Sequence, residues 1–206
     1  MKRELLESDH LLYRQLIDGI AVLVLNNPAK RNSLSTEVLT ALTRHLSIIA
    51  EDPSVRVVVL RAEGPVFSAG HDLRELRDTD DESNARLFGL CTDVMEAIRL
   101  LPQPVIAQVN GLATAAGCQL VASCDIAIAS EEATFATPGV KIGLFCTTPG
   151  VALARAVPSK KAMEMLLTGM PISAHEALQH GLVSRVVSAE TLEEHCMDLA
   201  RKVAAS

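Results

Sequence analysis

The stretch that decides the fold is residues 20–60, IAVLVLNNPAKRNSLSTEVLTALTRHLSIIAEDPSVRVVVL. It opens with the apolar run 20–25 and closes with the β-branched run 56–60, both typical of buried strands. Ser35 is predicted to be an N-cap between them, since apolar residues then recur at helical spacing. These residues are Val38, Leu39, Leu42, Leu46 and Ile49. Strand, helix and strand in this order predict a right-handed crossover.

The same alternation continues on both sides of this stretch. Upstream, residues 11–16 lead through Asp18-Gly19 into the run 20–25, which predicts a hairpin. Downstream, a polar loop over 78–83 precedes a predicted helix at 84–101, a strand at 105–109, a helix at 115–123, a strand at 125–129 and a helix at 160–168. The tail is predicted to hold a helix over 173–180, an extended segment over 182–187 and a helix over 189–204. Alternating strands and helices predict an α/β fold.

The composition bounds the size of the fold and its partners. The chain has 206 residues, 49% hydrophobic and 2% aromatic, with a formal net charge of −6. This length predicts a single domain over 1–206, with its core at about 10–187. Few aromatic side chains and a negative charge argue against nucleic acid as a partner. No apolar run approaches the roughly 20 residues of a membrane span.

The cysteines and the N-terminal residues bear on the cellular compartment. Five cysteines without a Cys-x-x-Cys pair disfavour a disulfide framework and thiolate zinc sites. Five histidines, His10, His45, His175, His180 and His195, are scattered along the sequence, which supports no metal site. The first nine residues carry three acids and no apolar stretch, which predicts neither a signal nor a transit peptide. We therefore expect a cytoplasmic protein.

Two loops that each follow a strand and enter a helix are rich in small residues. They are Phe67-Ser68-Ala69-Gly70-His71-Asp72-Leu73 and Asn110-Gly111-Leu112-Ala113-Thr114-Ala115-Ala116-Gly117-Cys118-Gln119. Small residues allow a ligand to approach the backbone, and free amides at a helix start favour negative charge. Amides from two such loops can converge on one oxygen, as in an oxyanion hole. Spacing alone favours ordinary tight turns instead.

With further motifs in the same order, these loops resemble the enoyl-CoA hydratase/isomerase (crotonase) superfamily over residues 10–205. Segment 110–153 is most similar to its hydratase-domain-containing, mitochondrial hydratase-like members. The other motifs that carry the resemblance are Cys124-Asp125-Ile126, Phe135, Pro138, Gly143, Leu167-Thr168-Gly169, Ile172-Ser173-Ala174 and Ala177.

The resemblance implies a fold, an assembly and a ligand. The fold is a spiral of ββα units, and the assembly is a homotrimer or a hexamer. The ligands are acyl-CoA thioesters, with no cofactor besides the coenzyme A of the substrate. Members continue past the equivalent of Ser206, so that the C-terminal helical region, which starts at 188–206, is expected to be largely missing.

The resemblance also implies a binding site. The backbone amides of His71 and Ala116 are expected to hold the thioester oxygen, and the His71 ring is expected to face solvent. Lys30 and Arg31 are placed near the nucleotide phosphates, although solvated surface charge explains them equally well. The remaining substrate-binding positions are Ala69, Gly70, Asp72, Leu73 and Gly117.

Hydratases of this family carry two glutamates whose positions are Gln119 and Gly139 here. Hydration needs groups that exchange protons, which neither a carboxamide nor a glycine can do. Cys146 is the nearby nucleophile, expected to be a buried, inert thiol. We expect an acyl-CoA-binding protein with weak or absent hydratase activity. The alternative is a non-catalytic crotonase-fold subunit or scaffold.

Overall fold

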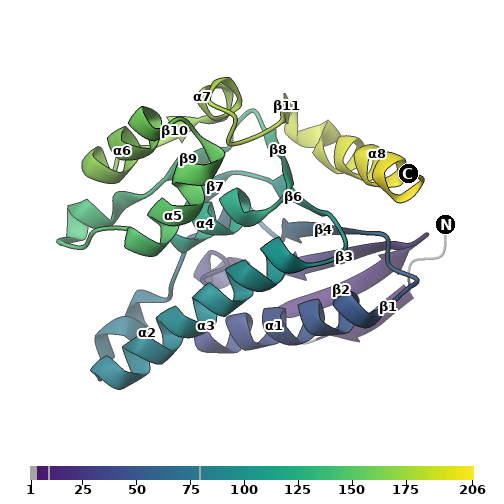
Figure 1. The fold of residues 1–206 in the computed structure, drawn as a ribbon, viewed down its shortest axis with the longest axis horizontal. Coiled ribbons are helices and arrows are strands. Elements are labelled where there is room, and N and C mark those ends of the chain that lie inside the picture. Colours follow the sequence, from purple (N-terminus) through teal and green to yellow (C-terminus); the bar gives the residue numbers. More distant parts are fainter. Residues whose placement is uncertain (1–3, 9, 79) are drawn as a thin grey trace.

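A computed structural model describes residues 4–8, 10–78 and 80–206, and its strands form two sheets (Figure 1). The larger sheet has, in spatial order, the strands β1 (Glu4–Ser8), β2 (Leu12–Ile17), β3 (Ile20–Leu25), β4 (Val57–Ala62), β6 (Val105–Val109), β8 (Ile126–Ser130) and β11 (Arg185–Val187). The smaller sheet has the order β10 (Ile172–Ser173), β9 (Thr134–Ala136), β7 (Leu112–Thr114) and β5 (Val66–Ser68).

The hairpin and the crossover predicted from residues 11–60 are confirmed. Strands β2 and β3 pair antiparallel, and the turn between them places Asp18 and Gly19 at φ 50° and 79°. Strands β3 and β4 pair in parallel, joined through α1 (Thr36–Glu51). The Ser35 side chain accepts a hydrogen bond from the Val38 amide and so caps this helix.

The chain then winds through three turns that each give one strand to each sheet. The first turn is β4 and β5, followed by α2 (Leu73–Asp78) and α3 (Asp81–Leu100). The second is β6 and β7, followed by α4 (Ala116–Ser123). The third is β8 and β9, followed by the 3₁₀ helix η2 (Pro138–Ile142) and α5 (Thr147–Ala156). This arrangement is the spiral of ββα units that the resemblance implied.

One local prediction needs correction, and two features were not predicted. The predicted loop over 78–83 reaches too far, because the Asp80 side chain accepts from the Ser83 amide at 2.8 Å and α3 starts at residue 81; residue 79 lies outside the described residues. Helix α5 escapes the sequence pattern because Pro149 lies in its first turn, where a proline is tolerated. The strands of the smaller sheet have two or three residues each, too few for an alternating pattern.

Helices cover both faces of the larger sheet. Helices α1 and α3 lie along one side and α8 (Leu192–Ala204) along the other (Figure 1). On the α8 side, Met197 and Ala200 pack on Val57, Val59 and Ile106. Burial on both faces explains why these strands are continuous apolar runs.

The remaining helices of the described residues are two α-helices and two 3₁₀ helices. They are α6 (Ser159–Thr168) and α7 (Ala174–Gln179), with the short 3₁₀ helices η1 (Pro28–Lys30) and η3 (Ala189–Thr191).

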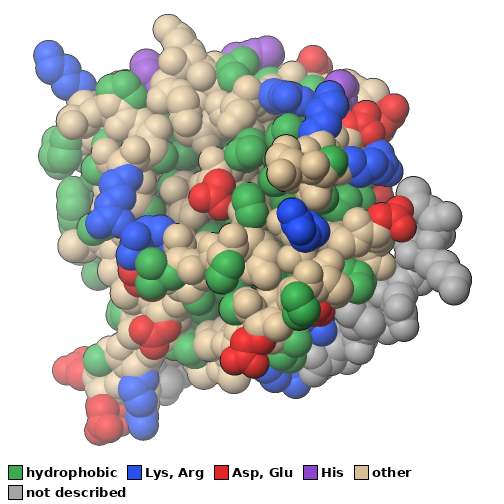
Figure 2. Space-filling view, turned by 45° about the vertical axis from the view of Figure 1, so that its right-hand side comes forward, with side chains coloured by type: hydrophobic (Ala, Val, Ile, Leu, Met, Phe, Trp, Pro, Cys, Tyr) green, Lys and Arg blue, Asp and Glu red, His purple; other side chains and the backbone are tan. Residues whose placement is uncertain are grey.

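On the face drawn in Figure 2, cationic side chains lie interspersed with acidic ones. In the described part of the chain, no helix has both the length and the apolar character needed to cross a membrane.

Candidate active site

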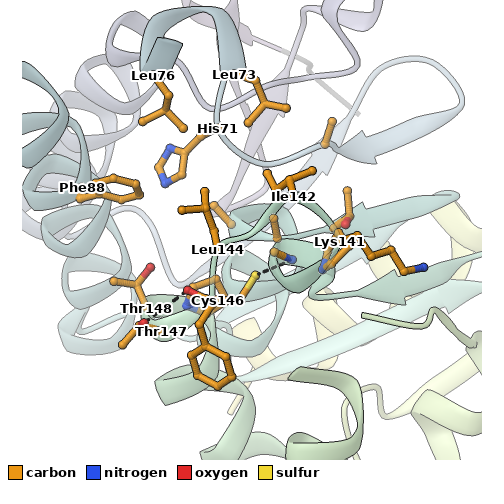
Figure 3. Close-up of a pocket in the computed structure, with 18 residues that line it drawn as sticks. His71, Leu73, Leu76, Phe88, Lys141, Ile142, Leu144, Cys146, Thr147 and Thr148 are labelled. Carbon is orange, nitrogen blue, oxygen red and sulfur yellow. Dashed lines mark hydrogen bonds between the residues drawn. The ribbon is translucent and has the colours of Figure 1, made fainter. Parts of the chain in front are cut away.

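A cavity of about 460 Å³ opens where the turns of the spiral meet (Figure 3). Its lining comes from segments that are distant in the sequence. These are the end of the first loop and α2 (Ala69, His71, Leu73 and Leu76), Phe88 of α3, the second loop (Thr114, Ala115 and Ala116), and the segment from Pro138 to Pro149. The two small-residue loops singled out in the sequence therefore share one cavity.

The two loops are in backbone contact, and glycines make the contact possible. A Cβ built on Gly117 would lie 2.3 Å from the Ser68 carbonyl oxygen. Gly70 has φ +82°, and a Cβ there would lie 3.0 Å from the Ala116 nitrogen. A side chain at either position would push the loops apart.

This contact brings two residues with candidate backbone donors, His71 and Ala116, to the lining of one cavity. Ala116 is the first residue of α4, so its N–H has no partner within the helix. Ala115 turns the chain into α4 at φ 52° and ψ −121°, a conformation that costs a non-glycine residue on the order of 1–3 kcal/mol. The amide of His71 belongs to the other loop, one residue beyond Gly70. Two donors beside one cavity can stabilise an oxygen that gains negative charge.

The segment 31–34 holds the first loop in place. The Ala69 amide donates to the Arg31 carbonyl at 3.0 Å, and the Ser68 hydroxyl donates to the Asn32 carbonyl at 2.8 Å. The Leu34 amide donates to the Gly70 carbonyl at 2.8 Å. The first loop is therefore held by hydrogen bonds to a segment that is distant in the sequence.

A second, polar hollow of about 260 Å³ adjoins the cavity and shares Ala69, His71 and Leu73 with it. Its cationic lining residues are Lys30, Arg31 and Arg74. Asp72 lies among them, with an oxygen 3.9 Å from the Lys30 ammonium. The other Asp72 oxygen accepts from the Arg74 amide and caps α2. A ligand with an anionic end and an apolar end would fit the two hollows together.

The expectation that the His71 ring faces solvent is wrong. The ring lines the cavity and meets the Phe88 ring edge-on, with centroids 5.1 Å apart and planes at 83° (Figure 3). Its Nδ1 lies 3.4 Å from the Leu34 carbonyl oxygen. Burial lowers the pKa of His71 below 6.5, partly opposed by the Leu34 carbonyl and the charge of Glu75. The ring is therefore neutral at neutral pH.

This lowered pKa predicts a pH-dependent contribution to stability. Because the unfolded chain binds the proton more readily, the contribution is complete above pH 6.5 and is lost as the pH falls through the folded pKa. Wild-type protein should lose more unfolding free energy between about pH 7 and about pH 5 than His71→Gln, which does not titrate there. Urea denaturation at the two pH values measures this, and equal losses in both proteins would contradict it.

The two positions of the hydratase glutamates differ in their surroundings. Gln119 is 6% exposed, does not line the cavity, and its side-chain oxygen has no hydrogen-bond partner among the described residues. Gly139 lines the cavity, yet a Cβ there would lie 2.8 Å from both the Cys146 sulfur and the Leu144 carbonyl oxygen. The space that a side chain at 139 needs is already filled.

Cys146 is buried, as expected, and its sulfur accepts a hydrogen bond from the Gly139 amide at 3.3 Å. Burial raises the pKa of this thiol, which keeps it protonated and weakly nucleophilic. Asp125, another residue of the quoted motifs, accepts from the Val105 amide at 2.7 Å. Within residues 4–8, 10–78 and 80–206, no group of three or more His, Cys, Asp or Glu side chains is arranged to hold a metal ion.

The sequence did not reveal the apolar walls of the cavity. Phe88 stands on α3 beside the buried stripe of that helix, and Leu144 extends toward His71 from the opposite side (Figure 3). One signal could have found Phe88. It is one of very few aromatic residues in the sequence, and it lies outside the apolar stripe of its helix. The convergence of Phe88 and Leu144 depends on the tertiary fold.

Comparison with known proteins places the chain among relatives of one kind. The profile of the family described as Enoyl-CoA hydratase/isomerase matches residues 16–206. The chain is 58% identical over 192 residues to "Enoyl-CoA hydratase domain-containing protein 3, mitochondrial" of Homo sapiens, covering 93% of this chain and 63% of that protein. The protein of the same name in Danio rerio is 53% identical over 201 residues, covering 97% and 70%.

Solved structures agree with this similarity. The crystal structure of human enoyl coenzyme A hydratase domain-containing protein 3 superimposes with a TM-score of 0.92 at 56% identity, covering 95% of this chain and 78% of that one. An enoyl-CoA hydratase of Mycobacterium smegmatis gives 0.94 at 50% identity, covering 96% and 78%. The chain spans 62–70% of the length of the hydratase-domain-containing relatives from five vertebrates.

The expectation of a cytoplasmic protein is wrong, because these relatives are named as mitochondrial proteins. The absence of a predicted disulfide framework fits a reducing compartment and does not distinguish one reducing compartment from another. The profile match, the identity over nine-tenths of the sequence and the superimposed structures agree. The chain belongs to the enoyl-CoA hydratase/isomerase family.

Proposed function

We propose that the chain binds acyl-CoA thioesters and holds the thioester carbonyl oxygen between the backbone amides of His71 and Ala116. The observation that supports this proposal is the contact through Gly70 and Gly117, which brings the two loops that carry these residues to one cavity. Alanine at 116 keeps the donor, because any residue except proline has a backbone N–H.

The adjoining hollow supports the same ligand. Its cations, Lys30, Arg31 and Arg74, are suited to the phosphates of the coenzyme. The pantetheine would then pass along the shared residues Ala69 to Leu73, and the acyl group would enter the apolar cavity. No step of this arrangement needs a metal or a resident cofactor.

The chemistry that this site favours is stabilisation of an enolate or a tetrahedral oxyanion. Two amide donors supply that stabilisation, often the largest single contribution to catalysis. Gln119 and Gly139 supply no carboxylate to activate water, so we expect weak or absent hydration of crotonyl-CoA. Isomerisation or thioester cleavage needs the oxyanion hole more than a pair of carboxylates.

The names of the relatives point to mitochondria as the compartment. The family resemblance points to a homotrimer or a hexamer as the assembly.

Ala116→Pro tests the oxyanion hole by removing one backbone donor, and because Ala115 precedes it at φ 52°, a conformation that is disfavoured before proline, the fold of the variant is checked first by circular dichroism. Proline is well tolerated at the first position of a helix, where the missing N–H costs no helical bond. Crotonyl-CoA should bind about tenfold more weakly to the variant, because the loss of one hydrogen bond typically changes an equilibrium constant by about this factor. Calorimetric titration measures the change, and free coenzyme A, which has no thioester carbonyl, is the control ligand whose affinity should stay the same.

Two outcomes would count against the proposal. Unchanged affinity of the folded Ala116→Pro protein for crotonyl-CoA would exclude its amide as a donor. No binding of acetyl-, crotonyl- or longer acyl-CoA to the wild-type protein below millimolar concentration would favour the scaffold, especially if mixed oligomers form with an active hydratase.

A further inference from the structure

Phe88 lines the α3 side of an apolar cavity that is also open to solvent elsewhere, since Leu73, Ile142 and Leu144 of its lining are each more than half exposed. The core-facing stripe of α3 is buried and consists of Leu87, Cys91, Val94, Met95 and Ile98. Phe88 lies outside that stripe, is 37% exposed, and yet lines the cavity. Its ring therefore has water on one side and the cavity on the other.

The His71 ring holds Phe88 in this position. The two rings meet edge-on, an arrangement that stabilises an aromatic pair beyond the burial of its surface. The His71 ring is itself attached to the scaffold, since Nδ1 lies 3.4 Å from the Leu34 carbonyl and Leu34 bridges to His71 in parallel. Phe88 is thus a supported wall rather than a freely rotating surface side chain.

The interior between this wall and the oxyanion site suits an apolar group. The facing side chains are Leu73 and Leu76 on one side and Ile142 and Leu144 on the other (Figure 3). Among the described residues that line the cavity, Lys141 alone carries a formal charge at neutral pH. Its ammonium lies 3.8 Å from the Met170 sulfur, and the side chain turns away from His71.

From this geometry we infer that Phe88, supported by the His71 ring, determines specificity by setting the length of the apolar acyl chain that the cavity accepts. This inference rests on the proposed binding of acyl-CoA thioesters. A chain that starts at the His71 and Ala116 amides runs between the apolar walls and stops at the Phe88 ring. Truncation of that ring opens the cavity to solvent on the α3 side.

A series of saturated acyl-CoA thioesters tests this inference by calorimetric titration. In the wild-type protein, affinity should rise roughly fourfold with each methylene that the cavity buries and then stay constant once the chain meets Phe88. In Phe88→Ala the rise should continue for several more carbons beyond the wild-type limit. Phe88→Leu keeps part of the side-chain volume, so the chain length at which affinity stops rising should lie between those of the wild-type protein and Phe88→Ala.

Two further variants serve as controls. One tests the support that the His71 ring gives to Phe88, and the other tests whether any apolar truncation on α3 changes the chain-length limit. His71→Ala keeps the amide donor and removes the ring, so it should move the limit in the same direction as Phe88→Ala. Leu100→Ala removes an apolar side chain that is 66% exposed on the same helix and outside the cavity, and it should leave the limit unchanged.

The outcomes distinguish this inference from the function on which it rests. An unchanged limit in Phe88→Ala, with short-chain binding retained, would overturn the role of Phe88 alone. Absence of binding by every thioester to the wild-type protein would overturn the proposed function itself. A shifted limit in Leu100→Ala would also contradict the assignment, because that side chain does not reach the cavity.

Discussion

Replacing Gly117 by alanine is expected to lower the unfolding free energy by about 3 kcal/mol or more, at the upper end of overpacking effects. The added Cβ would lie 2.3 Å from the Ser68 carbonyl oxygen and 2.8 Å from the Ser68 Cβ. Both belong to a segment tied down by the Ser68–Asn32 and Ala69–Arg31 hydrogen bonds, so neither can move cheaply.

The same substitution should also abolish acyl-CoA binding in the fraction that folds. Separating the two loops moves the Ala116 amide away from the His71 amide, and an oxyanion site depends on both donors. Urea denaturation gives the stability, and titration with crotonyl-CoA gives the binding.

Gly89→Ala is the matched control. Gly89 lies inside α3, and a Cβ there meets nothing within 4 Å. Alanine should therefore stabilise the protein by up to about 1 kcal/mol through helix propensity alone. If both alanine variants had the same stability, the close approach at Gly117 would not be the tight contact described above.

Gly139→Glu is expected to destabilise the protein by about 3 kcal/mol or more and to leave crotonyl-CoA hydration unrestored, even when combined with Gln119→Glu. The Cβ alone would overlap the Cys146 sulfur and the Leu144 carbonyl oxygen, each at 2.8 Å. The carboxylate would enter a cavity lined mainly by apolar side chains, where an unpaired charge is costly.

A double-mutant cycle with Cys146→Gly isolates the cause. Removing the sulfur relieves one of the two overlaps, so Gly139→Glu should cost less in that background, and the two substitutions should couple. Urea denaturation of the four proteins measures the coupling. Additive effects, or hydration at ordinary enzyme rates of roughly 1–10³ per second in Gly139→Glu/Gln119→Glu, would show that position 139 is free to accept a carboxylate.

Local signals in the sequence were sufficient for β2, β3, β4, β6 and β8 of the larger sheet, whereas β1 (Glu4–Ser8) was not predicted. Ser35 with the apolar spacing after it predicted α1, Asp18-Gly19 predicted the first hairpin turn, and the run 105–109 predicted β6. Each of these signals acts over a few residues, through a cap, a turn conformation or a side-chain period. The smaller sheet was missed because three-residue strands are stabilised by their partners rather than by their own pattern.

The site divides in the same way. The sequence by itself indicated the two small-residue loops that can supply amides, and the family resemblance assigned that role to His71 and Ala116. Only the tertiary structure decided that the two loops touch, that the His71 ring turns to Phe88, and that Cys146 fills the space beside Gly139. The physical reason is that these are contacts between atoms on different turns of the spiral. Their distances follow from how the two sheets and α3 pack, which no local pattern encodes.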